Sequence, residues 1–126
     1  MSKAQLYIVQ DLGISKQDIE GLISLANLPY QVIYANQEAN PALVEGLINI
    51  NAKLDAAFLA SFPQLKFIAV AFTGYDSVDL AYCKDKGIAV YNVPTYATDS
   101  VAELTLGVTL SWLREIHTGN VSIRQG

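Results

Sequence analysis

The chain has 126 residues, of which 52% are hydrophobic, and its formal net charge is −4 at neutral pH. This length and hydrophobic content predict one domain with a substantial core and exclude an intrinsically disordered segment. The acidic net charge argues against a nucleic-acid surface, and no apolar run approaches the roughly 20 residues of a membrane span.

The few residues with reactive side chains exclude several kinds of site. The single cysteine, Cys83, excludes an internal disulfide and favours a cytoplasmic location, where thiols stay reduced. Since Cys83 falls on a predicted helix, we interpret it as a packed small side chain rather than as a nucleophile. One histidine, His117, and one cysteine make no metal-ligand cluster. We interpret His117 as a surface residue at the end of the last helix.

The first predicted elements are a strand, a helix and a second strand. The apolar run at 5–10 predicts a short buried strand, which a turn follows. Apolar residues at helical spacing predict a helix over 15–26, with Ser15 as its N-cap. The segment 30–35 has the composition of a strand. This order is typical of the beginning of an α/β domain.

The middle of the chain predicts two more helices around a short strand. Asn40 as a cap and Pro41 at the first helical position predict a short helix over 41–47. The apolar residues at 47–50 favour a third strand, although its boundary with that helix is left open. A further helix is predicted over 54–62, ending before a proline.

The last part of the chain contains the clearest strand. The run at 66–71 is continuously apolar, which predicts burial on both faces of a sheet. A helix follows over 77–86 and ends at Gly87, a residue suited to a C-cap. A fifth strand at 88–93 and the longest helix, 100–116, complete the predicted elements.

Strand and helix therefore alternate five times, without an internal repeat. This alternation predicts a three-layer, flavodoxin-like α/β fold with a five-stranded parallel sheet in the order 2-1-3-4-5. Ligands of such sheets bind outside the carboxyl ends of the strands. The residues that follow the strands, and that we expect at this edge, are mostly neutral and polar: Gln10, Asp11, Asn36, Asn49, Asn51, Thr73, Gly74, Tyr75, Asp76, Asn92, Thr95, Tyr96 and Thr98.

Common catalytic and nucleotide-binding motifs are absent from the sequence. It contains no nucleophile elbow, no G-x-G-x-x-G and no P-loop. A flavodoxin would have a Ser/Thr-rich phosphate loop at 10–15, where this chain has one serine. A phospho-receiver would need several acids and a lysine, of which only Asp11 is present. We interpret Asp76 and Asp79 as helix-capping residues rather than as a carboxylate pair.

Four segments together point to one family. They read "INAKLDAAFL" (50–59), "GYDSVD" (74–79), "KGIAVYNVP" (86–94) and "TDSVAE" (98–103), in this order along the chain. With these segments the chain closely resembles the NAD-dependent D-2-hydroxyacid dehydrogenases. It is most similar to their glycerate dehydrogenase (hydroxypyruvate reductase) and phosphoglycerate dehydrogenase branches. The resemblance covers nearly the whole chain.

The resemblance implies roles for particular residues. In this family, backbone N–H groups of the turn that here reads Thr73-Gly74 hold the substrate carboxylate, and Thr73 would also lie near the nicotinamide. Tyr96 matches an aromatic residue that faces the active site in some members. Asn49 stands at the strand end that lines the cleft. Phe72 replaces a glycine found in many members, which leaves the shape of the cleft open.

The family continues into a dinucleotide-binding domain with the catalytic Arg, Glu and His, and His117 does not match that histidine. We therefore expect 1–126 to be a single, isolated substrate-binding domain for small 2-hydroxy or 2-keto acids. It would have no catalytic residue, no metal and no bound NAD of its own, although the full-length parent would use NAD. The alternative is a free-standing flavodoxin-like binding or interaction domain without catalytic activity.

The longest predicted helix, 100–116, has apolar residues on all sides. Such a helix requires burial on more than one side. We expect it either to pack on the sheet of its own chain or to pair two chains in a homodimer. Ser100 and Glu103 form an S-x-x-E pattern, which predicts a capping box at the start of this helix.

Overall fold

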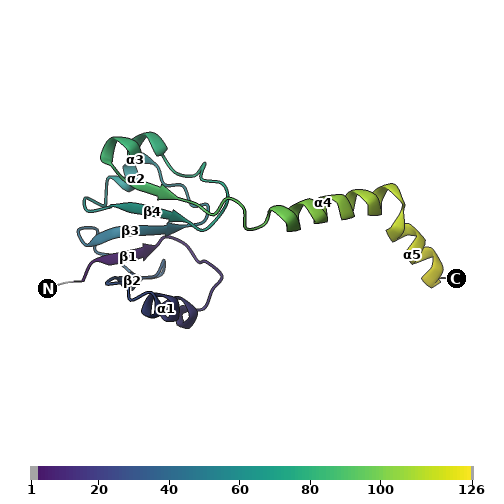
Figure 1. The fold of residues 1–126 in the computed structure, drawn as a ribbon, viewed down its shortest axis with the longest axis horizontal. Coiled ribbons are helices and arrows are strands. Elements are labelled where there is room, and N and C mark those ends of the chain that lie inside the picture. Colours follow the sequence, from purple (N-terminus) through teal and green to yellow (C-terminus); the bar gives the residue numbers. More distant parts are fainter. Residues whose placement is uncertain (1–2, 126) are drawn as a thin grey trace. The chain divides into compact units, whose positions relative to one another are not determined.

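The structure, a computed structural model, describes residues 3–125 and contains two compact units, one reaching to Pro94 and one beginning at Thr95 (Figure 1). The elements of the first unit are β1 (Gln5–Ile8), α1 (Lys16–Leu25), β2 (Gln31–Ile33), β3 (Val44–Asn49), α2 (Ala56–Leu59), β4 (Phe67–Val70), α3 (Leu80–Lys86) and β5 (Ala89–Tyr91). Those of the second unit are α4 (Thr98–Leu113) and α5 (Ile116–Gln125). That the whole chain acts as one domain stays a prediction.

The five strands form one parallel sheet in the order β2-β1-β3-β4-β5, as predicted. Leu6 of β1 lies opposite Val32 of β2 on one side and Gly46 of β3 on the other. The chain therefore adds β2 on one side of β1 and then returns to add β3, β4 and β5 on the other side. The carboxyl ends of all five strands lie at the same edge. The switch point of the topology lies at β1 and β3, and such sheets bind ligands in the crevice outside the carboxyl ends of these strands.

The main hydrophobic core lies on one face of the sheet. Leu47 of β3 and Ile68 of β4 are fully buried and pack with Leu59 of α2 and Cys83 of α3. Ile19 of α1 is also buried but does not belong to this cluster, because α1 lies on the other face of the sheet. The fold therefore has three layers, as expected for a parallel sheet between helices.

Cys83 is a packed core residue, which confirms the sequence interpretation. Its side chain is buried on α3 and forms no disulfide. Burial, and secondarily the carboxylate of Asp79, raise the pKa of the thiol. The thiol is therefore a poor nucleophile at neutral pH, since only the thiolate attacks.

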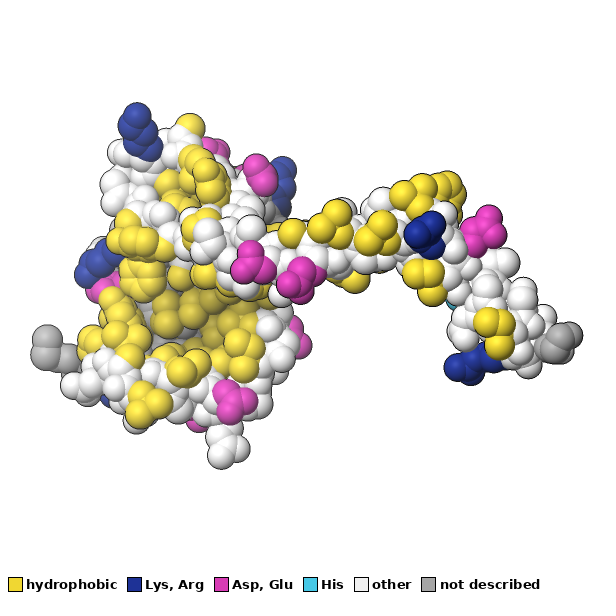
Figure 2. Space-filling model, turned by 45° about the vertical axis from the view of Figure 1, so that its right-hand side comes forward, with side chains coloured by type: hydrophobic (Ala, Val, Ile, Leu, Met, Phe, Trp, Pro, Cys, Tyr) yellow, Lys and Arg dark blue, Asp and Glu magenta, His cyan; other side chains and the backbone are white. Residues whose placement is uncertain are grey.

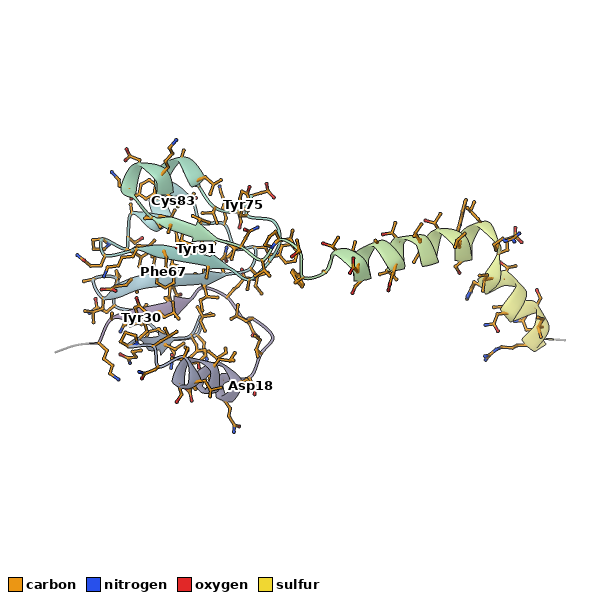
Figure 3. The ribbon with its side chains drawn as sticks, in the orientation of Figure 1. Asp18, Tyr30, Phe67, Tyr75, Cys83 and Tyr91 are labelled. Carbon is orange, nitrogen blue, oxygen red and sulfur yellow. The ribbon has the colours of Figure 1, made fainter. Side chains whose placement is uncertain are left out.

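Helix α1 covers its face of the sheet only in part. Val90 of β5 contacts the main core, so its neighbour Tyr91 points to the opposite face, where it is 63% exposed. Toward α1, the rings of Phe67 and Tyr30 pack edge to face with their centroids 6.1 Å apart (Figure 3). Figure 2 shows hydrophobic side chains lining a hollow on this unit. This face thus remains more open than the α2–α3 face.

The predicted helix over 41–47 is wrong. The Asn40 carbonyl accepts the amide of Leu43 at 2.9 Å, and the Asn40 side chain accepts that of Ala42 at 3.1 Å, so Asn40 caps a turn and not a helix. From Val44 onward the chain pairs with β1 and β4 on both sides. These sheet hydrogen bonds, together with burial of the strand, override a helical pattern that was only two turns long.

Most helix ends follow the predicted capping residues. The side chains of Ser15 and Asp79 accept backbone N–H groups at the starts of α1 and α3, at 3.1 and 2.9 Å. Gly87 ends α3 in the left-handed conformation, with φ of 69°. Asp55 caps α2 in the same way as Asp79 caps α3. Asp76 has no such capping bond, so of the two expected capping acids only Asp79 is confirmed.

The second unit differs from the prediction at both ends of its first helix. The capping box is wrong: α4 begins at Thr98 without a side-chain cap, and Ser100 is already helical, so its hydroxyl cannot reach the amide three residues ahead. The helix ends at Leu113, because Glu115 has a φ of 52°. A further helix, α5, follows that the sequence did not predict, and His117 lies exposed within it.

The apolar side chains of α4 are exposed, and the helix buries none of its residues. Trp112 is the most exposed of them, at 81%. Figure 2 shows hydrophobic side chains along this helix. The exposed apolar residues are Val101, Leu104, Leu106, Val108, Leu110, Trp112 and Leu113.

Gly46 provides the first test of this packing. An added Cβ would overlap Cζ of Phe67 and lie 2.8 Å from Cδ1 of Leu6. We expect Gly46→Ala to lower the free energy of unfolding by about 1–3 kcal/mol through overpacking, as measured by chemical denaturation. Gly21→Ala is the matched control, since a Cβ there meets nothing within 4 Å and alanine favours a helix. Equal effects of the two substitutions would contradict this packing.

Candidate functional site

The loops at the carboxyl edge of the sheet are tied to one another. The amide of Ala71, after β4, donates to the carbonyl of Asn49 at the end of β3, at 2.7 Å. The amide of Val93, after β5, donates to the carbonyl of Phe72 at 3.1 Å. Because adjacent strand ends share these bonds, the residues that follow β3, β4 and β5 form one continuous surface.

Asn49 is a buried support of this edge. Its side chain is completely buried; Nδ2 donates to the carbonyl of Ala52 at 2.9 Å and to Oγ of Ser77 at 3.4 Å. Its Oδ1 accepts the amide of Ala52 at 3.1 Å. The side chain therefore joins the loop after β3 to the segment after β4. That Asn49 contacts a substrate stays a prediction, and its observed partners are all protein groups.

The Thr73-Gly74 turn is held in place by the segment that follows β5. The carbonyl of Thr73 accepts Nδ2 of Asn92 at 2.7 Å, and the Thr73 hydroxyl donates to the carbonyl of Val93 at 3.3 Å. Within the described residues, the backbone N–H groups of Thr73, Gly74 and Tyr75 donate to no protein acceptor. A fixed turn with successive unused N–H groups can receive an anion.

Gly74 does not adopt the left-handed conformation, so this turn does not require glycine for its backbone angles. A Cβ at this position would meet only Oδ2 of Asp76, at 3.2 Å. The absence of a side chain leaves room for the close approach of another molecule. The Asp76 carboxylate beside the turn opposes anion binding, although its exposure to solvent weakens this repulsion.

Gln10 is the residue whose importance the sequence did not indicate. It was expected at this edge only as one of many polar residues after the strands. In the structure its Nε2 donates to Oδ1 of Asn51 at 3.0 Å, and its Oε1 accepts the amides of Asn51 and Ala52 at 3.2 and 2.6 Å. The polar side chain at the end of the predicted strand 5–10 was the one available signal.

The remaining candidates are placed as follows. Tyr96 belongs to the second unit and is 60% exposed, so its role at the turn stays a prediction. Lys53 lies in the segment after β3, and its Nζ lies 3.7 Å from Oδ2 of Asp55. Among residues 3–125 no three His, Cys, Asp or Glu side chains are grouped to hold a metal ion. No described helix is long and apolar enough to span a membrane.

The residues present do not fit NAD by themselves. The hydroxyl and carbonyl of Thr73, the residue predicted to approach the nicotinamide, are both engaged with protein groups. The sequence has no glycine-rich turn for the pyrophosphate. Thr73 can at most form part of a wall beside the ring, and we derive no hydride-transfer step from this chain.

A parallel sheet wound in this order, with a braced turn at its carboxyl edge, defines an α/β domain of the class that binds small ligands at that edge. Residues 32–121 match the family described as D-isomer specific 2-hydroxyacid dehydrogenase, catalytic domain. The chain belongs to this family, which confirms the resemblance found in the sequence.

Curated relatives include several reductases of 2-keto acids. The chain is 38% identical over 78 residues to a hydroxyphenylpyruvate reductase of Plectranthus scutellarioides, covering 62% of this chain and 25% of that protein. It is 36% identical over 97 residues to a glyoxylate/hydroxypyruvate reductase B of Yersinia enterocolitica, covering 77% and 28%. The chain thus spans about a quarter of the length of these relatives.

Solved structures of dehydrogenases share the fold. A glyoxylate/hydroxypyruvate reductase of Sinorhizobium meliloti, in complex with citrate, superimposes with a TM-score of 0.76 at 26% identity, covering 100% of this chain and 39% of that one. A D-lactate dehydrogenase of Aquifex aeolicus, with NAD and lactic acid, gives a TM-score of 0.74 at 25% identity, covering 95% and 37%.

Asn49 allows a test of the edge itself. We expect Asn49→Ala to lower the free energy of unfolding by about 1–3 kcal/mol, because buried polar groups of the loop lose their partners. Amide exchange at Ala52 should also become faster, as measured by hydrogen–deuterium exchange. Asn36→Ala, at an exposed asparagine after β2, is the control and should change neither quantity. Unchanged exchange at Ala52 in Asn49→Ala would show that Asn49 does not hold the loop.

Proposed function

We propose that this chain is the substrate-binding domain of an NAD-dependent D-2-hydroxyacid dehydrogenase, and that the turn at 73–75 holds the carboxylate of a small 2-hydroxy or 2-keto acid. The observation that carries the proposal is the set of three successive backbone N–H groups without a protein acceptor at the carboxyl edge of the sheet. Successive backbone N–H groups of a turn can bind an anion without a basic side chain, which supports the proposal.

Relatives of this chain support the chemical class of the ligand. The Aquifex aeolicus enzyme was solved with NAD and lactic acid, and the Sinorhizobium meliloti enzyme with NADP and malonate in one structure and citrate in another. Lactate, malonate and citrate all carry carboxylates. The activity of a whole enzyme, its use of NAD and its choice of acid belong to our proposal, because this chain covers only part of those proteins.

The proposed role is binding and orientation. A carboxylate fixed at the turn would direct the C2 carbon of the acid away from the sheet, toward the side from which a dinucleotide-binding domain supplies the cofactor. Thr73 would stand beside the nicotinamide. A cytoplasmic location is part of the same proposal, and the buried free thiol of Cys83 supports it.

Ligand titration tests the turn directly. We expect D-glycerate or glyoxylate to shift the amide resonances of Thr73, Gly74 and Tyr75 in ¹H–¹⁵N spectra, with a millimolar dissociation constant, or about 4 kcal/mol. Gly74→Val should weaken this binding about tenfold or more, because a side chain would cover the N–H groups. Equal binding by the valine variant would show that the turn at 73–75 does not hold the carboxylate.

The charge beside the turn supplies the control for this titration. Asp76→Asn should bind the acid about two- to fivefold more tightly at low salt, because one like charge is removed. Asp85→Asn changes the net charge equally, but Asp85 lies on α3 with Lys86 3.0 Å away, and it should leave binding unchanged. Equal effects of the two substitutions would indicate a general effect of charge.

We also propose that α4 pairs two chains in a homodimer. Leu106, Leu110 and Leu113 follow one another at helical spacing and are all more than half exposed. Light scattering should find a dimer, and Leu106→Glu with Leu110→Glu should convert it to a monomer. The polar substitution Thr105→Glu, at an exposed position of the same helix, should not. A monomer before any substitution would contradict the proposal.

A further inference from the structure

We propose that Gln10 is a positioning residue of the candidate site: its side-chain amide holds the loop at 50–53 in place beside the turn at 73–75. The inference rests on the proposed function, since the position of this loop matters only if a ligand binds at the turn. It extends the site to the segment that follows β1, for which neither the sequence motifs nor the family resemblance assign a role.

The amide of Gln10 is committed to this loop at both of its ends. Oε1 accepts two successive backbone N–H groups, those of Asn51 and Ala52, at 3.2 and 2.6 Å. Nε2 donates to Oδ1 of Asn51 at 3.0 Å. Three hydrogen bonds to two neighbouring residues fix both the distance and the orientation of the loop relative to β1.

The other side of the loop is tied to the segment that follows the turn. The amide of Leu54 donates to the carbonyl of Ser77 at 2.8 Å, and the amide of Asp79 donates to the carbonyl of Leu54 at 3.0 Å. Since Asn49 also bonds Ser77, the loop is held between Gln10 and the residues just after the turn. A displacement at Gln10 is therefore transmitted to the wall beside the carboxylate.

Packing alone does not fix the side chain of Gln10. It is only partly buried, and it borders a cavity of about 250 Å³, which Ile8, Asp11 and Tyr34 also line. Its position thus depends on the hydrogen bonds to the loop. The reverse also follows: without Gln10 the amide of Ala52 keeps only Oδ1 of Asn49, and that of Asn51 loses its acceptor.

Strand β1 contains a natural control at its other end. Gln5 accepts the amide of Asn40 through its side-chain oxygen at 2.9 Å, and it is buried. This bond holds a loop at the amino edge of the sheet, on the side opposite the candidate site. Each of the two glutamines thus holds a loop at one edge of the sheet, and only the loop that Gln10 holds lies at the edge of the proposed site.

The experiment compares Gln10→Ala with Gln5→Ala in the same D-glycerate titration. We expect Gln10→Ala to raise the dissociation constant about five- to tenfold, because binding groups must be held within a fraction of an ångström. Amide exchange at Ala52 should also become faster. Gln5→Ala should lower the unfolding midpoint at least as much as Gln10→Ala and leave the dissociation constant unchanged. Gln10→Glu keeps both acceptor bonds and should keep Ala52 protected.

The possible outcomes separate this inference from the function on which it rests. If the unaltered chain binds D-glycerate and Gln10→Ala binds it equally well, Gln10 has no positioning role while the proposed function stands. An equal loss of binding in Gln5→Ala would mean that Gln10→Ala weakens binding only through a general loss of stability. This result would overturn the inference. If the unaltered chain binds no acid at all, the proposed function fails, and the positioning role fails with it.

Discussion

The structure depends on the parallel pairing of β1 with β2 on one side and β3 on the other. This double pairing places β2 on one side of β1 and the later strands on the other. Because all five strands are parallel, their carboxyl ends lie at the same edge of the sheet. Burial enforces this pairing, because Leu6 of β1 and Leu47 of β3 are buried and a register shift of one residue would turn such side chains to the opposite face. The candidate site exists only because this edge collects five strand ends.

Neutral side-chain amides complete the edge where strand pairing stops. Beyond the last ladder bonds, backbone groups need other partners, and Gln10, Asn49 and Asn92 supply them. Each amide offers both a donor and an acceptor without adding charge, so these residues brace the loops and leave the electrostatic field weak. The turn at 73–75 can then offer its own N–H groups to a carboxylate, with Asp76 as the nearby opposing charge.

Some site features were predictable because they are local in sequence. The apolar strand before Thr73 and the glycine after it predicted a turn at the carboxyl edge of the sheet, and the structure has a turn there. That this turn binds a substrate stays a prediction. The sequence could not show that Gly74 has ordinary backbone angles, or that a Cβ at this position would lie 3.2 Å from Oδ2 of Asp76. The bracing bonds of Thr73 come from residues about twenty positions away, so no local pattern could indicate them.

The sequence by itself determined the α/β class, the strand order and most helix ends, because hydrophobic periodicity and capping act over a few neighbouring residues. Only the tertiary structure decided that 44–49 is a strand, because its neighbours β1 and β4 supply hydrogen bonds and burial that outweigh a weak helical pattern. It also decided the role of Gln10, whose partners lie 41 and 42 residues further along the chain. Such pairings form when the sheet forms, and they depend on its register rather than on any local preference.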